Sequence, residues 1–140
     1  MNRVMRAVAA IALTAVAACT TTPRGTKVEV PGGFYRSVSV DELASMLKHK
    51  DFFLVNVHVP YAGEIPKTDA FISYQDTQKR LGEYPPEKRA RIVVYCMTNH
   101  MSGIAARVLV QAGYTDVYLV DGGMTAWQKA NYELDRKAAP

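Results

Sequence analysis

The feature of this 140-residue sequence that most constrains its fold is the alternation of short apolar segments with segments of helical periodicity. The segments FFLVNV (52–57), RIVVYC (91–96) and DVYLV (116–120) are rich in β-branched and aromatic residues. Between the last two, apolar residues recur at helical spacing through 104–112 and stop at Gly113. Strands that are apolar on both faces need cover on both faces. The sequence therefore predicts an α/β three-layer sandwich, with a mainly parallel sheet of about five strands and helices on both faces.

A capping-box pair marks the start of the first helix, because Ser39 is followed three residues later by Glu42. The other expected elements are strands at 35–40 and 70–74, a short helix at 76–84 and a last helix at 123–130. In such a fold, chemistry is found where the parallel strands end and loops lead into helices.

The first 19 residues, MNRVMRAVAAIALTAVAAC, carry the pattern of a secretory signal: basic residues, an uncharged apolar run and small residues before a break. The run is too short and too rich in alanine to span a bilayer. Val16–Cys19 resembles a bacterial lipobox, which implies cleavage before Cys19 and lipid on that cysteine. The alternative is an amphipathic or buried N-terminal helix, although no polar face recurs at helical spacing.

The lipobox resemblance sets the expected domain organisation and location. Residues 1–18 form a lipoprotein signal peptide, residues 19–33 a tether rich in Thr, Pro and Gly with a short extended piece at Lys27–Val30, and residues 34–137 the folded domain. Several acyl chains on one residue make a stable membrane anchor. Because Thr20 and not Asp follows the cysteine, the lipoprotein pattern favours the outer membrane. We therefore expect a lipid-anchored protein of the cell envelope, on the periplasmic side of a bacterial membrane.

The charge balance gives little support for nucleic-acid binding. Removal of Arg3 and Arg6 with the signal lowers Lys plus Arg from 17 to 15 against 13 acidic residues, so the net charge falls from +4 to +2. No basic stripe interleaved with aromatic residues is present. We expect no nucleic-acid partner.

Cys96 is the strongest candidate for chemistry. It ends an apolar strand segment, and the only other cysteine is Cys19. If Cys19 carries lipid, Cys96 has no disulfide partner in an oxidising compartment. The loop after Cys96 leads into a helix N-terminus, where backbone N–H groups lack helical partners and can form an anion-binding concavity. Such donors favour a thiolate, but position alone fits an inert core thiol equally well.

The expected substrate-binding residues are those of this loop and the first helical residues after it: Met97, Thr98, Asn99, His100, Met101 and Ser102. Asn99 in mid-loop tolerates a positive φ angle almost as well as glycine does. Cys96 and His100 together supply too few ligands for a metal site, so we expect no metal or other cofactor. A cysteine phosphatase would need an arginine six residues after the nucleophile, where Ser102 stands.

Several separate features resemble one known family. IVVYC, a five-residue loop, Ser102 and then GIAARVLVQAGYTDVYLVDGGMTAW resemble the second half of a rhodanese domain, and the resemblance covers about Tyr35–Leu134. It implies a single-domain sulfurtransferase in which Cys96 attacks a sulfur donor such as thiosulfate and carries the sulfur as a persulfide to a thiol acceptor. Catalysis of this kind is covalent and proceeds in two steps.

The earlier segment LVNVHVPYAGEIP matches the family less closely. Asn56 stands for an Asp, His58 for an Arg and Glu64 for a His of the family pattern, a variant that resembles exported rhodanese-like proteins. We take His58 and Glu64 as candidate pocket residues. Arg107 is expected to be solvated on its helix, and Asp121 to shape a turn or cap the last helix.

The loop MTNHM differs from rhodanese loops that use thiosulfate, because it has neither arginine nor glycine. The sequence therefore predicts weak activity with thiosulfate, and a less charged or protein-bound sulfur donor. The expected partners are a small sulfur donor, a thiol acceptor or a protein thiol, and the membrane through lipid on Cys19; the expected oligomeric state is a monomer. The alternative function is a non-catalytic binding or regulatory module at the cell envelope.

Overall fold

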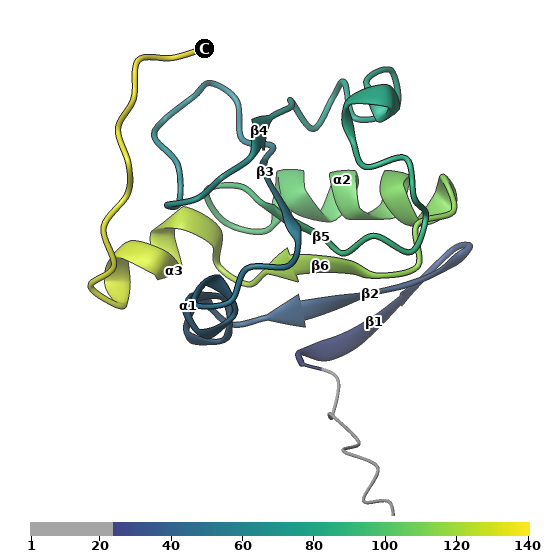
Figure 1. Cartoon of the computed structure of the whole chain (residues 1–140), viewed down its shortest axis with the longest axis horizontal. Coiled ribbons are helices and arrows are strands. Elements are labelled where there is room, and N and C mark those ends of the chain that lie inside the picture. The colour runs from purple at the N-terminus through teal and green to yellow at the C-terminus, as the bar shows by residue number, and fades with distance from the viewer. Residues whose placement is uncertain (1–23) are drawn as a thin grey trace, which may run out of the picture.

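The computed structural model describes residues 24–140, and the expected signal peptide and Cys19 lie outside the described residues. The described chain forms one sheet of six strands in the order β1-β2-β6-β5-β3-β4 (Figure 1). The elements in chain order are β1 (Thr26–Val30), β2 (Gly33–Val38), α1 (Val40–Leu47), β3 (Phe53–Asn56), β4 (Ala70–Phe71), the 3-10 turn η1 (Leu81–Glu83), β5 (Ile92–Tyr95), α2 (His100–Gln111), β6 (Val117–Val120) and α3 (Gly123–Lys129). Strands β2, β6, β5, β3 and β4 are parallel, and β1 pairs with β2 as an antiparallel hairpin. The predicted α/β class and mainly parallel sheet are confirmed.

The helices cover both faces of the sheet, as predicted. Helix α2 packs Ala105, Ala106 and Leu109 on one face. Helices α1 and α3 lie on the other face, where Leu43 and Trp127 are buried (Figure 1). All four residues of β5 are buried and alternate between the two cores, which explains why this strand reads as a continuous apolar run.

The capping box opens α1 as the sequence predicts. Ser39 Oγ accepts the backbone N–H of Glu42 at 3.1 Å, and Glu42 Oε2 accepts the N–H of Ser39 at 2.8 Å. The Glu42 carboxylate also accepts the N–H of Gly25 at 3.2 Å, so the first helix is linked to the start of the described chain.

Three segments differ from the sequence-based expectation. Residues 26–30 form the edge strand β1, which includes the extended piece expected at Lys27–Val30, so the sheet begins before Phe34 and within the segment expected to be tether. The helix expected at 76–84 is a series of turns with only η1, since Gly82 and the prolines that follow leave no room for an α-helix. The strand expected at 70–74 is confined to Ala70–Phe71, because β4 lies at the sheet edge and pairs with β3 alone.

The carboxyl ends of β3, β5 and β6 meet at one edge of the sheet. The register pairs Asn56 with Tyr95 and Val94 with Leu119, so the three strands end almost level. The segments that leave this edge are the loop after Val57, the loop after Cys96 and the turn at Asp121. Parallel topology therefore gathers three loops around Cys96.

Candidate active site around Cys96

Cys96 is the first residue after β5, and its side chain is 2% exposed. It is a free cysteine, with its Sγ 3.3 Å from the Oγ of the fully buried Ser102. The Ser102 hydroxyl donates its proton to the carbonyl of Asn99 at 3.2 Å. A serine has one hydroxyl proton, so the uncharged Cys96 thiol must donate to Ser102 Oγ. When the thiol loses its proton, the hydroxyl can rotate and donate to the sulfur instead.

The N-terminus of α3 holds the backbone of the Cys96 loop. The carbonyl of Cys96 accepts the N–H of Met124 at 2.9 Å, and the carbonyl of Met97 accepts the N–H of Thr125 at 3.0 Å. In a planar trans peptide the N–H points away from the C=O. The N–H groups of Met97 and Thr98 therefore face away from α3.

The backbone N–H groups that follow Cys96 are available as hydrogen-bond donors. Among residues 24–140, no hydrogen-bond partner is found for any backbone N–H of residues 97–102. Donors without partners next to a sulfur atom are suited to stabilise negative charge there. The arrangement can therefore bind an anion or a sulfur anion at the end of β5.

Gly123 makes the close approach of α3 possible. It has φ +53°, and a Cβ added there would lie 2.2 Å from the Cys96 carbonyl oxygen and 2.7 Å from that of Thr98. No side chain fits at this distance, so only glycine allows the loop and the helix to meet. The Gly122-Gly123 pair after β6 is the sequence signal for this contact.

Asn99 acts through its side chain and does not use the positive φ angle that asparagine tolerates, since its φ is −131°. Its amide group donates to Asp121 Oδ1 at 2.8 Å, and its Oδ1 accepts the N–H of Gly122 at 2.8 Å. These bonds join the Cys96 loop to the turn after β6. Asp121 therefore positions the loop, and it does not cap the last helix as one expectation had it, since the N-cap of α3 (Gly123–Lys129) is Gly122.

The two candidate pocket residues lie in different environments. His58 follows Val57, whose N–H donates to the Tyr95 carbonyl at 2.9 Å, so His58 lies at the sheet edge beside the start of the Cys96 loop. Its Nδ1 is buried with no partner in the described chain, and burial lowers the pKa of its imidazole. Asn56 holds this segment, because its side chain accepts the N–H of His58 and donates to the Gly63 carbonyl, both at 3.0 Å.

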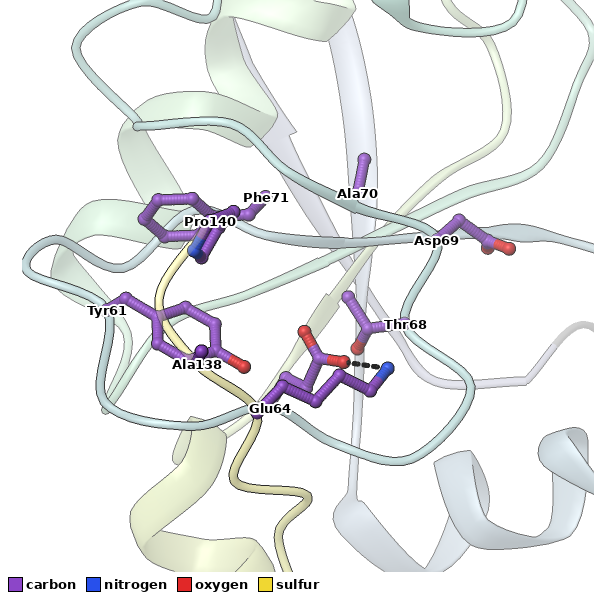
Figure 2. A pocket seen from close by; sticks show the side chains of 9 residues that line it. Tyr61, Glu64, Thr68, Asp69, Ala70, Phe71, Ala138 and Pro140 are labelled. Carbon is purple, nitrogen blue, oxygen red and sulfur yellow. Dashed lines mark ion pairs between the residues drawn. The ribbon is translucent and has the colours of Figure 1, made fainter.

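Glu64 lies in a separate cavity of about 210 Å³ that includes none of residues 96–102. It is 8% exposed and forms an ion pair with Lys137 at 2.7 Å (Figure 2). Its backbone pairs with that of Asp135 in both directions, at 2.8 and 2.7 Å. Glu64 therefore anchors the C-terminal segment, and the structure does not bring it to Cys96. Nearby, burial and the Glu64 carboxylate raise the pKa of Tyr61.

Within residues 24–140, no three His, Cys, Asp or Glu side chains come together as a metal site would require. In the same range, no helix has the length and apolar character needed to cross a membrane.

Comparison with known proteins gives consistent matches. A family model described as the rhodanese-like domain matches residues 39–130. The thiosulfate sulfurtransferase GlpE of Pseudoalteromonas translucida is 29% identical over 104 residues, covering 71% of this chain and 94% of that protein. The protein of the same name from Vibrio cholerae is 27% identical over 100 residues, covering 70% and 92%.

Solved structures agree on the fold. A rhodanese-like domain protein from Staphylococcus aureus superposes with a TM-score of 0.62 at 26% identity, covering 73% of this chain and 98% of that one. The Alr3790 protein from Anabaena superposes with the same TM-score at 23% identity, covering 71% and 81%.

Proposed function

Because this chain belongs to the rhodanese-like domain family, we propose that it is a sulfurtransferase that carries sulfane sulfur as a persulfide on Cys96. The observation that carries the proposal is the Cys96 loop itself. The carbonyls of Cys96 and Met97 are bound to α3, and the N–H groups of residues 97–102 have no partner among residues 24–140. A persulfide adds one anionic sulfur beyond Sγ, and these donors are placed to stabilise it.

The proposed reaction has two steps. The Cys96 thiolate attacks the outer sulfur of the donor, a new S–S bond forms on Cys96, and the donor's own bond to that sulfur breaks; from thiosulfate the leaving group is sulfite. An acceptor thiolate then attacks the terminal sulfur and releases the Cys96 thiolate. Ser102 Oγ, 3.3 Å from the sulfur, supports both thiolate states by rotating its hydroxyl toward Sγ.

We propose that thiosulfate is a weak donor for this protein. The loop 97–101 has no arginine or lysine, and its only titratable side chain, His100, is exposed. Each missing charge-assisted hydrogen bond to a dianion is worth about 1.5–3 kcal/mol, or roughly 10- to 150-fold in affinity. The relatives named thiosulfate sulfurtransferases support the reaction class. The loop chemistry supports a less charged or protein-bound donor.

We also propose export and lipid anchoring. The lipobox-like segment before Cys19 supports attachment to the cell envelope on the periplasmic side, with the outer membrane favoured. The proposed partners are a small sulfur donor, a thiol acceptor or protein thiol and the membrane, for a monomeric protein without cofactor or nucleic acid.

A second candidate function is a non-catalytic binding module, favoured by one observation: the Cys96 side chain is only 2% exposed. The two functions are tested by sulfur transfer in the full chain and in a Cys96→Ser variant. We expect turnover with a polysulfide donor and a thiol acceptor, slower turnover with thiosulfate and cyanide, and none in the variant. Absence of turnover with every donor would support the binding module. Turnover with thiosulfate as fast as that of an arginine-bearing rhodanese would contradict the donor proposal.

A further inference from the structure

A hollow of about 310 Å³ lies beside the Cys96 loop, between α2 and the β1–β2 hairpin. Its floor includes Tyr35, Gly103 and Leu119, which are buried, and its rim includes the exposed side chains of Arg107 and Asp121. The volume is large enough for a molecule of amino-acid size or somewhat larger. The active-site loop forms part of its wall through Asn99 and His100.

One side of the hollow is formed by a row of residues along α2 and its N-cap. Asn99, Gly103 and Arg107 follow at intervals of four residues, so they lie on the same side of the helix, facing the hairpin. Gly103 has no side chain and leaves space in the middle of the row. A Cβ added at Gly103 would lie 3.5 Å from Arg107 Nη1, so the guanidinium lies back over Gly103 toward the helix N-terminus.

The hollow carries one charge of each sign, and the two do not neutralise each other. Among residues 24–140, Arg107 forms no ion pair within 4.0 Å, and neither does Asp121. Asp121 uses Oδ1 to accept from the Asn99 amide, which leaves Oδ2 without a recorded partner in the same part of the chain. A ligand with both a carboxylate and an ammonium group matches this arrangement, whereas the carboxylate of Asp121 disfavours a plain anion.

The hollow is also close to the reactive sulfur through two contacts. The Asn99 side chain lines it, and the Asn99 carbonyl accepts the hydroxyl of Ser102 at 3.2 Å. Ser102 Oγ is in turn 3.3 Å from Cys96 Sγ. The hollow therefore shares Asn99 with the hydrogen-bonded chain that ends at the sulfur.

We propose that this hollow binds the sulfur acceptor, and that the acceptor is a small amino-acid thiol. Its carboxylate pairs with Arg107 and its ammonium group with Asp121. This inference rests on the proposed sulfur transfer. The acceptor thiolate attacks the terminal sulfur of the Cys96 persulfide, the bond from that sulfur to Sγ breaks, and Cys96 leaves as a thiolate. The acceptor becomes a persulfide, so no external oxidant or reductant is consumed.

Two thiols that differ only in the carboxylate test the assignment. Cysteine has the carboxylate and the ammonium group, and cysteamine has only the ammonium group. We expect the full chain, loaded with sulfur on Cys96, to discharge to cysteine with a kcat/KM about five- to tenfold above that for cysteamine, since the pair with Arg107 is partly solvated. Arg107→Gln abolishes this preference. The matched control Arg89→Gln removes an exposed arginine outside the hollow and keeps it.

A binding measurement separates this inference from the sulfur chemistry. S-methylcysteine and S-methylcysteamine cannot accept sulfur as thiols but keep the groups that the hollow would recognise. In NMR titrations of the full chain in detergent micelles, S-methylcysteine should shift the amides of Ser37 and Gly103, and S-methylcysteamine should do so much less. If S-methylcysteine binds but no donor forms a persulfide on Cys96, the ligand site is supported and sulfur transfer is overturned. Transfer with no binding and an unchanged cysteine preference in Arg107→Gln would overturn the acceptor site alone.

Discussion

Replacement of Gly123 by alanine should disrupt both stability and chemistry, because this residue is where α3 meets the Cys96 loop. The added Cβ would lie 2.2 Å from the Cys96 carbonyl oxygen, 2.7 Å from the Thr98 oxygen and 2.8 Å from the Met97 carbonyl carbon. All three are backbone atoms and cannot swing aside as a side chain would. The loop or the helix must therefore move.

The magnitude has two sources. A φ of +53° in a residue with a Cβ costs about 1–2 kcal/mol. Displacement of packed backbone adds about 1–3 kcal/mol, as overpacking does in cores. The free energy of unfolding should fall by about 2–5 kcal/mol in total, which lowers Tm by roughly 8–20 °C in a domain of this size. Because the loop moves, the rate at which Cys96 takes up sulfur should fall about tenfold or more.

Thermal unfolding and sulfur loading of Gly123→Ala measure the two effects, with Gly82→Ala as the matched control. A Cβ at Gly82 meets nothing within 4 Å, so this variant should stay within about 0.5 kcal/mol of the parent protein. If Gly123→Ala melts within 2–3 °C (roughly 0.5 kcal/mol) of the parent and loads sulfur at the parent rate, the contact between α3 and the loop is not as described.

Two further predictions follow from single hydrogen-bonded groups. Ser102→Ala removes the hydroxyl 3.3 Å from Cys96 Sγ, so the first-order rate of persulfide formation should fall about tenfold. Ser102→Thr keeps a hydroxyl and should restore most of the rate. Equal rates in all three proteins would contradict the role given to Ser102. The capping bonds from the Ser39 N–H and the Ser39 side chain lower the pKa of Glu42 from its usual value. The carboxylate therefore stabilises the fold above the unfolded-state pKa, and this contribution is lost as the pH falls through the lower folded-state pKa. Urea unfolding of Glu42→Gln should show reduced stability at pH 7 and a difference from the parent that shrinks in acid, and a constant difference would refute the assignment.

The layers of the fold were predictable because their signals are local. The buried run at 92–95 and the capping box of Ser39 with Glu42 each depend on a few neighbouring residues, and both are found as expected. Strand β1 was harder to predict. Its strand state depends on pairing with β2 across a tight turn, and its own pattern of exposure gives only a weak signal.

The part of the site that lies at the end of β5 could be predicted from the sequence. Cys96 and its loop could be identified from RIVVYC and the helix after it. The role of Gly123 depends on a contact across 27 positions, and the bond of Asn99 to Asp121 spans 22. Neither Arg107 nor Asp121 carries a sequence signal for a shared hollow, because that hollow requires the hairpin to pack beside α2.

The measurement that tests the central claim most directly is the mass of the chain after treatment with a sulfur donor, followed by peptide mapping. Incubation of the reduced full chain with polysulfide should add the mass of one sulfur atom to the peptide that contains Cys96, and subsequent addition of cysteine should remove it. The Cys96→Ser variant should gain no sulfur that cysteine can discharge. Failure of every donor to add sulfur at Cys96, or an adduct that no thiol removes, would contradict sulfur transfer through this residue.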